Sequence, residues 1–242
     1  MRRLVIIKAG STIPSLRQQP GDFEDWILAG MNLSATDPRV SVVDVTAGQP
    51  LPDYDGLAGV VVTGSHEMVT DRLPWSERTA AWLPGLADRR IPTLGICFGH
   101  QLLAHAFGGE VAANPRGRSF GSIDVTLCPE AAADPLLGGL PSPMKVYVSH
   151  TQSVTELPPG AKRLATSLHD PNHAFVIAGC MWGVQCHPEF DAEIATAYLK
   201  TFGELLEADG QDPRALAAAC ARSSPAAVLL SRFGRLVQGQ LS

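Results

Sequence analysis

Cys97 is the residue whose neighbours most strongly indicate chemistry. It lies in Gly95-Ile96-Cys97-Phe98-Gly99, where an apolar run ends and a segment with helical spacing begins. Glycines two positions away on each side allow the sharp strand-to-helix turn on which a nucleophile stands. The start of the helix would favour the thiolate, and the amide of Phe98 would point toward a developing oxyanion. The alternative is a cysteine that only packs, since cysteine is among the most often buried residue types.

A histidine and a carboxylate that could serve this cysteine lie ninety residues further on (187 − 97). The segment Trp182–Phe190 predicts a strand that enters a turn at Pro188. There His187 could accept the thiol proton, and Glu189 could reach back to the imidazole and select its tautomer. The alternative is that His187 is an exposed histidine at the end of a strand and that Glu189 is an unrelated acid.

The elements that must position these residues follow from the apolar pattern. Short apolar runs alternate with helical segments in the first part of the chain, which predicts a parallel sheet with helices on both faces. The strands are expected at 4–9, 40–45, 59–63 and 91–96, and the helices at 22–33, 74–86 and after Cys97. The middle of the chain has strand-like runs with little helix between them, which predicts an antiparallel patch on that sheet. These runs are 121–127, 144–148, 161–166, 173–178 and 181–186.

The last part of the chain returns to helix, at 191–206, 212–221 and 225–237. Ser224 before Pro225 is a plausible helix start. We expect one domain over residues 1–207, with residues 208–242 as a helical extension of the same domain. The expected fold class is therefore α/β, an open and mostly parallel sheet with a small antiparallel patch and a C-terminal helical appendage.

Composition excludes several classes of function. The 242 residues carry a formal net charge of −5 and no basic run, so nucleic acid is not an expected partner. No stretch approaches the ~18 apolar residues that a membrane span needs, and Leu4–Ile7 is too short for a signal peptide. We expect a cytoplasmic protein that does not bind membranes. The five cysteines contain no CxxC pair, so neither a metal site nor a disulfide framework is expected.

Other residues near these motifs have simpler interpretations. His100, in the first turn after Cys97, is expected to face outward. Cys186 is expected to pack in the core, because strand alternation places it opposite His187. Asp170 and His169 are expected in a turn.

Taken together, the motifs resemble the class I (triad) glutamine amidotransferase family, and within it the glutaminase domain of GMP synthase and its free-standing relatives. Gly95–Gln101 resembles the nucleophile motif, His187-Pro188-Glu189 the histidine–glutamate motif, and Val62–Ser65 the loop after the oxyanion strand. The segments 71–75 and 108–115 are similar to those of the free-standing relatives. The resemblance covers about residues 40–200, and three separate motifs in order are far more specific than any one of them.

The resemblance implies a flavodoxin-like fold, a role for each matching residue, and no cofactor. Cys97 would attack the γ-carboxamide of glutamine or of a γ-glutamyl compound, His187 would move the protons, and Glu189 would orient His187. The amides near Gly64 and of Phe98 would stabilise the oxyanion. The residues implied to contact the small-molecule substrate are Ser65, Gln101, Ser149, His150 and Thr151.

The sequence also departs from the family pattern. Ser119 stands where many relatives have an acid, and Thr151-Gln152 follows His150 where GMP synthases commonly have Gly-Asp. No ATP-binding glycine-rich loop appears up to Ser242, so any synthase partner is expected to be a separate protein chain.

Several functions stay open at this stage. One is glutamine hydrolysis that feeds ammonia to a partner, and another is stand-alone hydrolysis of glutamine or of γ-glutamyl peptides. A non-catalytic regulatory or binding protein on the same fold is the alternative from a different class. A third candidate is a different cysteine-elbow hydrolase, of the kind seen in stress-related peptidase-like proteins. Those proteins usually have histidine directly after the cysteine, whereas Phe98 stands here.

Overall fold

The computed structural model describes residues 2–17 and 21–241, so residues 1, 18–20 and 242 of the expected domain lie outside the described residues. The strands form a nine-stranded sheet in the order β2-β1-β3-β4-β11-β10-β9-β6-β7. Five neighbouring strands are parallel and carry the apolar runs expected to be buried. They are β2 (Val40–Asp44), β1 (Arg3–Lys8), β3 (Leu57–Val62), β4 (Thr93–Ile96) and β11 (Met181–Val184).

The other end of the same sheet is antiparallel. It contains β10 (Ala174–Ile177), β9 (Lys162–Ser167), β6 (Ser119–Leu127) and β7 (Met144–His150). The expected antiparallel patch on a parallel sheet is therefore confirmed. β11 belongs to both parts, because it runs parallel to β4 and antiparallel to β10. It also ends at Val184, two residues earlier than expected, so His187 follows the strand rather than closing it.

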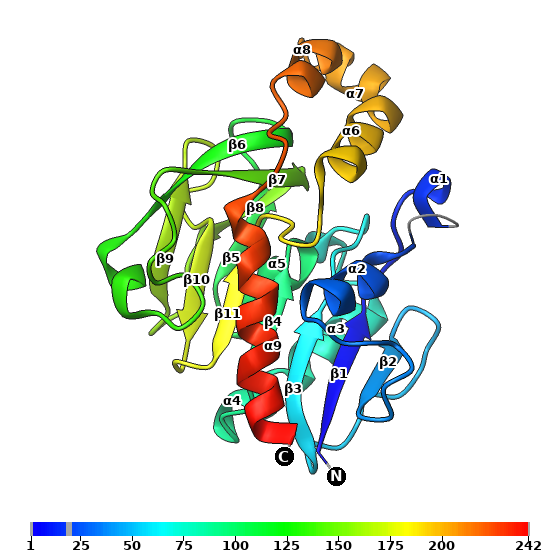
Figure 1. Ribbon diagram of the computed structural model, residues 1–242, viewed down its shortest axis with the longest axis vertical. Coiled ribbons are helices and arrows are strands. Elements are labelled where there is room, and N and C mark those ends of the chain that lie inside the picture. The colour runs from blue at the N-terminus through cyan, green and yellow to red at the C-terminus, as the bar shows by residue number, and fades with distance from the viewer. Residues whose placement is uncertain (1, 18–20, 242) are drawn as a thin grey trace.

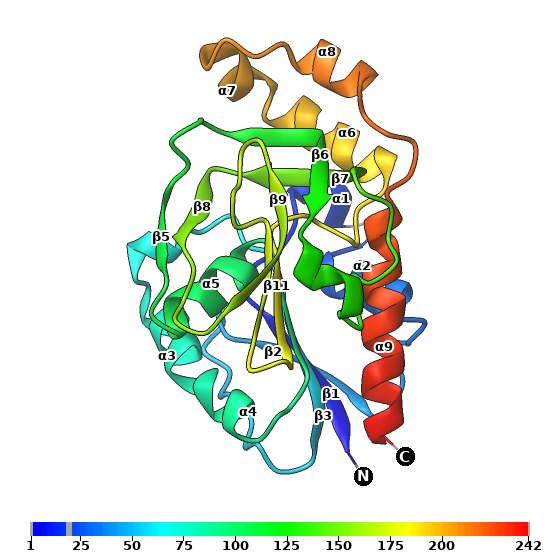
Figure 2. The same ribbon diagram turned by 90° about the vertical axis from the view of Figure 1, so that its left-hand side faces the viewer.

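Helices cover both faces of the sheet (Figures 1 and 2). Alternate residues of β1 belong to two different cores, since Leu4 and Ile6 pack in one and Val5 and Ile7 in the other. The first core is closed by α2 (Phe23–Gly30) and α9 (Val228–Leu241), and the second by α3 (Pro74–Trp82), α4 (Pro84–Asp88) and α5 (Phe98–Ala106). Burial on both faces explains the unbroken apolar runs of β1 and β3, whereas the edge strand β2 is only partly buried.

A second, two-stranded antiparallel sheet was not expected from the sequence. It pairs β5 (Glu110–Ala113) with β8 (Gln152–Glu156). None of the four residues of β5 is fully buried, so the strand lacks a clear apolar pattern. This small sheet matters for the site because Gln152 at its start follows β7 directly.

Two expected helices are each divided in the structure. The segment 74–86 contains α3 and α4, which meet at Leu83 because Pro84 begins the second helix. The segment 191–206 contains α6 (Ala192–Thr201) and α7 (Gly203–Ala208), joined at Phe202. The short α1 (Pro14–Arg17) and the 3₁₀ turns η1 (Val69–Asp71) and η2 (Pro129–Ala133) complete the elements before α6.

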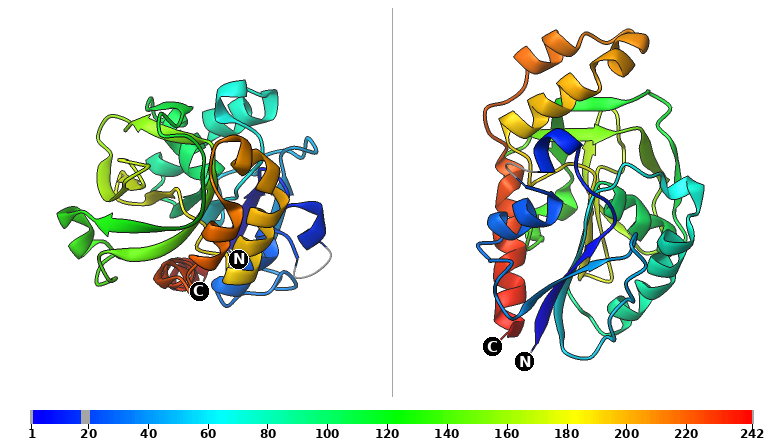
Figure 3. Two further views of the ribbon diagram at one scale, coloured as in Figure 1. Left: turned by 90° about the horizontal axis from the view of Figure 1, so that it is seen from above. Right: turned by 90° about the vertical axis from the view of Figure 1, so that its right-hand side faces the viewer.

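The C-terminal segment first extends the molecule and then returns along it (Figures 1 and 3). The helices α6, α7 and α8 (Pro213–Ala218) lie above β6 and β7, and η3 (Pro225–Ala227) leads into α9. The side chain of Ser224 accepts a hydrogen bond from the amide of Ala226, as expected for a helix start. At the far end Arg2 Nη1 donates to Gln240 Oε1 at 2.7 Å, so α9 ends beside the start of β1. Within residues 2–17 and 21–241, no helix is long and apolar enough to cross a membrane.

Candidate active site

Cys97 stands at the turn between β4 and α5, in a backbone conformation that non-glycine residues seldom adopt. Its φ is 51° and its ψ is −101°. The flanking glycines are required by close packing rather than by their own torsion angles. A Cβ on Gly99 would lie 2.4 Å from the carbonyl oxygen of Val62, and one on Gly95 would lie 2.4 Å from that of Gly99. The helix can therefore start directly against β3 and β4 only with glycine at both positions.

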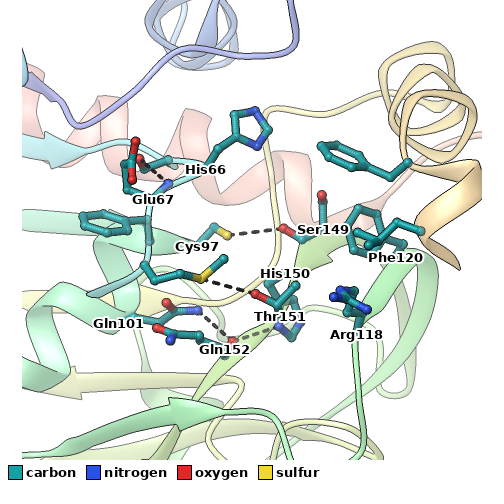
Figure 4. A pocket seen from close by; sticks show the side chains of 15 residues that line it. His66, Glu67, Cys97, Gln101, Arg118, Phe120, Ser149, His150, Thr151 and Gln152 are labelled. Atoms are coloured by element: carbon teal, nitrogen blue, oxygen red, sulfur yellow. Dashed lines mark hydrogen bonds between the residues drawn. The ribbon is translucent and has the colours of Figure 1, made fainter. Parts of the chain in front are cut away.

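The thiol of Cys97 is almost buried and has three polar neighbours. Its Sγ lies 3.7 Å from the carbonyl oxygen of Ser149 at the end of β7 and 3.6 Å from Nε2 of Gln185. The imidazole of His187 is also close enough for Cys97 to raise the pKa of that imidazole. The residue is 4% exposed and borders a cavity, so a substrate group in that cavity could reach the sulfur (Figure 4).

The structure brings His187 and Glu189 together, as the sequence predicts. Nδ1 of His187 lies 2.7 Å from Oε1 of Glu189, and both side chains are buried. Phe190 stacks on the imidazole with ring centroids 4.1 Å apart, and the backbone N–H of His187 donates to the carbonyl of Tyr147. With Nδ1 facing the carboxylate, Nε2 is the nitrogen left for the thiol.

The pKa of His187 is set by burial and by two neighbouring side chains. Burial alone would lower its pKa, but the negative charge of Glu189, its hydrogen bond, and the neighbouring Cys97 raise the pKa to about 10. The imidazole is therefore protonated at neutral pH. The protonated ring carries one proton on Nδ1, toward Glu189, and one on Nε2. The proton on Nε2 is the one that a leaving group could take.

The two residues expected to form an oxyanion site lie on either side of this group. Gly64 follows β3, and a Cβ placed there would be 3.1 Å from Cε1 of His187. Its loop is held by Thr63, whose hydroxyl donates to the carbonyl of Gly64 and accepts from the amide of Ala9. Phe98 is the first residue of α5 and packs against Trp75.

A cavity of about 300 Å³ opens beside the thiol. Its lining includes all five residues expected to contact the substrate, together with Cys97 and Phe98: Ser65, Gln101, Ser149, His150 and Thr151. They come from different elements, since Ser65 lies in the loop after β3. Figure 4 shows Gln101 on α5, Ser149 and His150 at the end of β7, and Thr151 between β7 and β8.

Several of these side chains already form hydrogen bonds with other groups of this chain. Nε2 of Gln101 donates to the carbonyl of Gln152 at 2.8 Å and to Oε1 of Gln185 at 3.0 Å. Nδ1 of His150 lies 3.0 Å from the same Gln152 carbonyl, and its Nε2 lies 3.3 Å from Asp170. The imidazole of His150 is therefore engaged away from the cavity.

The far wall of the cavity was not predicted from the sequence. It is formed by Arg118 and Phe120 at the start of β6, by Phe202 between α6 and α7, and by Leu205 of α7. Arg118 Nη1 lies 2.5 Å from Oδ2 of Asp209, which fixes the guanidinium against the C-terminal helices. The pair Arg118 and Phe120 lies more than eighty positions before the pair Phe202 and Leu205 (202 − 120 = 82). No local motif joins the two pairs.

His100 does not face outward, so that expectation was wrong. The side chain is fully buried and packs against Phe175 in a tilted arrangement, with ring centroids 4.8 Å apart. Its pKa is lowered to about 3, mainly by burial. The room for it comes from Gly183 on β11, where a Cβ would lie 2.8 Å from Nδ1 of His100. A glycine inside a strand was the one signal in the sequence for such a close approach.

A buried polar cluster behind the cavity was also missed. Asp170 lies in a turn, as expected, but it is buried against His150 and His173, with its carboxylate 3.3 Å and 3.7 Å from their rings. Burial would raise the pKa of Asp170, but the two histidines lower it well below its usual range. Asn114 and Ser153 donate to the same carboxylate, which ties the small β5–β8 sheet to the turn. In the part of the chain described here, no group of three or more His, Cys, Asp or Glu is arranged to hold a metal ion.

A cysteine elbow at the end of a parallel strand, faced by a buried His–Glu pair, defines the class of α/β proteins with a cysteine triad arrangement. The chain belongs to a particular family within it, because the model of glutamine amidotransferase class-I matches residues 32–204. The resemblance inferred from the motifs and the expected fold class are therefore confirmed.

Similar proteins include GMP synthases and one subunit of a GMP synthase. The glutamine-hydrolyzing GMP synthase of Porphyromonas gingivalis is 37% identical over 154 residues, which cover 62% of this chain but only 28% of that protein. One subunit of the glutamine-hydrolyzing GMP synthase of Natronomonas pharaonis is 38% identical over 145 residues, covering 57% of this chain and 69% of that protein. A glutamine amidotransferase from Thermotoga maritima shares the fold, with a TM-score of 0.77 at 23% identity, covering 98% of this chain and 99% of the other.

Proposed function

We propose that this protein hydrolyses the γ-carboxamide of glutamine, or a related γ-glutamyl amide, through a γ-glutamyl thioester on Cys97. The observation that carries the proposal is the buried pair of His187 and Glu189, whose Nδ1 and Oε1 lie 2.7 Å apart, close to the Cys97 thiol that borders the cavity. Membership of the glutamine amidotransferase family supports the substrate class. A purely regulatory protein would have no need of a buried charged pair beside a reactive thiol.

The chemistry proceeds in two halves. The thiol proton resides on Nε2 of His187, and the thiolate forms a bond to the amide carbon, while the amides of Gly64 and Phe98 stabilise the oxyanion. The C–N bond then breaks, and the leaving amine takes the proton from His187. In the second half His187 accepts a proton from water, the hydroxide attacks the thioester, and the C–S bond breaks to release glutamate and the thiolate.

Ammonia release to a separate synthase chain is one destination of the product. The Natronomonas pharaonis relative supports this proposal, because its name describes one subunit of a GMP synthase and hence a chain that works with a second one. The matched region spans about 28% of the length of the Porphyromonas gingivalis GMP synthase.

Stand-alone hydrolysis of larger γ-glutamyl amides is the second candidate. The cavity beside the thiol continues to a wall of Phe120, Phe202 and Leu205, with Arg118 beside them. Glutamine loses only ammonia and needs no such wall, whereas a γ-glutamyl amino acid has an apolar side chain and a carboxylate to place there.

Two measurements test both candidates: the release of ammonia and glutamate from L-glutamine, and the release of glutamate and the free amino acid from a panel of γ-glutamyl amino acids. We expect release by the wild type, none by Cys97→Ala, and unchanged release by the matched control Cys128→Ala, whose thiol lies outside the site. A preference for γ-glutamyl amino acids favours the stand-alone function, and a preference for glutamine favours ammonia donation. Equal activity of Cys97→Ala and the wild type would sink the proposal. So would a lack of release from every substrate, combined with no labelling of Cys97 by a glutamine-analogue electrophile.

A further inference from the structure

Gln185 is a buried polar side chain that the mechanism above does not use. It follows β11 directly and has no exposed surface (0%). Its Nε2 lies 3.6 Å from Sγ of Cys97. Its backbone N–H donates to the carbonyl of His173 at 2.8 Å, which fixes the main chain from which the side chain leaves. A buried carboxamide thus rests against the attacking sulfur.

The orientation of this carboxamide decides what it does, because one end donates hydrogen bonds and the other accepts them. Three contacts in succession fix the orientation. The backbone carbonyl oxygen of Gln152 can only accept, so Gln101 turns its Nε2 toward it, at 2.8 Å. The same Nε2 donates to Oε1 of Gln185 at 3.0 Å. With its oxygen engaged there, Gln185 presents an N–H to the sulfur.

The reversed arrangement is excluded by the same contacts. Turning Gln185 alone would place its NH₂ group against that of Gln101. Turning both would place Oε1 of Gln101 against the carbonyl oxygen of Gln152. Both side chains are buried, with Gln101 only 4% exposed, so two facing groups of the same kind would carry a large desolvation cost.

The two uncharged neighbours of the sulfur favour different protonation states. The carbonyl oxygen of Ser149, at 3.7 Å, can accept the thiol proton, and the thiolate has no proton to give it. The N–H of Gln185 donates to the sulfur and binds an anion more strongly than a neutral group. The protein therefore holds one group that favours the thiol and one that favours the thiolate.

We propose that Gln185 is a further catalytic residue, whose carboxamide N–H, oriented by Gln101 and the backbone of Gln152, stabilises the Cys97 thiolate. It acts before attack and again when the C–S bond of the thioester breaks and its electron pair returns to the sulfur. The inference rests on the proposed nucleophilic role of Cys97 but not on the identity of the substrate.

The test is the pH profile of Cys97 alkylation by iodoacetamide, followed by mass spectrometry of the peptide that contains Cys97. The full chain is compared as wild type and as Gln185→Met, which keeps length but removes the donor. We expect the profile to move to higher pH by about one unit, and the rate at pH 7 to fall about tenfold. An unchanged profile in a folded Gln185→Met variant overturns the proposal.

Two further variants keep the test decisive. Gln101→Met removes the group that orients Gln185, and we expect a smaller shift in the same direction; no shift there overturns the proposal even if Gln185→Met fails to fold. Gln152→Met keeps the backbone carbonyl and removes only a side chain that contacts Thr70 at 2.6 Å, so its profile should match the wild type. A shift in Gln152→Met as large as that in Gln185→Met also overturns the proposal, because it indicates a general disturbance of the pocket. Alkylation needs no turnover, so these shifts in a protein that hydrolyses no γ-glutamyl compound would refute the proposed function alone.

Discussion

The strained backbone of Cys97 persists because its neighbours leave the chain no other path. Its φ of 51° places it among five non-glycine residues with positive φ in the described part of the chain. Such a conformation costs on the order of 1–3 kcal/mol. The close contacts of Gly95 and Gly99 with the carbonyls around them hold the turn in place. The strain at Cys97 is therefore maintained by the close packing of Gly95 and Gly99.

The first prediction concerns Gly99, because its added methyl group would meet backbone rather than a flexible side chain. Gly99→Ala would place a Cβ 2.4 Å from the Val62 carbonyl oxygen, so β3 and α5 must separate. We expect a loss of about 2–4 kcal/mol in the free energy of unfolding, and slower alkylation of Cys97. The matched control is Gly239→Ala in α9, where a Cβ meets no atom within 4 Å. Equal stability of the two variants in urea unfolding would contradict this account.

The second prediction concerns pH. The folded-state pKa of His187 is about 10 against an ordinary value of 6.5, so the folded protein holds a proton that the unfolded chain releases in between. The stabilisation is complete below pH 6.5 and is lost as the pH rises through 10. The free energy of unfolding should therefore fall across this range.

Urea unfolding at intervals from pH 6.5 to 10 measures that fall. Glu189→Gln removes a negative charge that raises the pKa of His187, so the stability of this variant should depend less on pH than that of the wild type. A slope in the variant as steep as that of the wild type would argue against Glu189 as a source of the shift.

At the scale of elements, the segment that leads into α9 is held by the side chain of Ser224. Ser224 accepts a hydrogen bond from the amide of Ala226 and donates to the carbonyl of Lys145 at 3.0 Å, which joins the start of the helical segment to β7. We expect Ser224→Ala to cost about 1 kcal/mol in the free energy of unfolding. Ser231→Ala within α9 is the matched control and should be close to neutral, because alanine is the better helix former. The prediction fails if thermal unfolding finds the two variants alike.

The elements that the sequence predicts well are those with a clear pattern and a clear boundary. The central parallel strands β1 and β3 carry unbroken apolar runs, and the turn at Cys97 is marked by its glycines. The β5 and β8 pair was missed because β5 is partly exposed and its register with β8 is irregular. The division of α3 from α4 follows from Pro84, whereas Phe202 between α6 and α7 has no such local cause. Patterns therefore predicted the elements that hold the catalytic groups better than those that close the pocket.

At the scale of the whole molecule, the site combines parts that are distant in the sequence. The parallel half supplies Cys97 and His187 at neighbouring strand ends, and the antiparallel half supplies Ser149 and the β6 wall. Motifs could predict the first group, because each member lies in a short local pattern. They could not predict that α6 and α7 would pack over β6 and bring Phe202 and Leu205 to the pocket.

The fourth prediction concerns this assembled wall. If larger γ-glutamyl amides are substrates, Arg118 is the group placed to meet a carboxylate on their amine part. We expect Arg118→Ala to lower kcat/KM about fivefold for γ-glutamyl amino acids and much less for γ-glutamyl amides without a carboxylate, since the guanidinium is partly exposed. Arg116→Ala is the matched control, because Arg116 lines a neighbouring cavity and not this one. An equal loss for both substrate types would refute a role in selecting carboxylates.

The burial of His100 against β11 also limits which substitutions can be accepted at His100 and at the positions that contact it. A Cβ on Gly183 would lie 2.8 Å from the His100 ring and 2.7 Å from that of Phe175, so these three positions share one space. A larger residue at Gly183 becomes acceptable only after both rings have been exchanged for smaller groups. We therefore expect the three positions to covary among homologous sequences, and to change far less often singly than together.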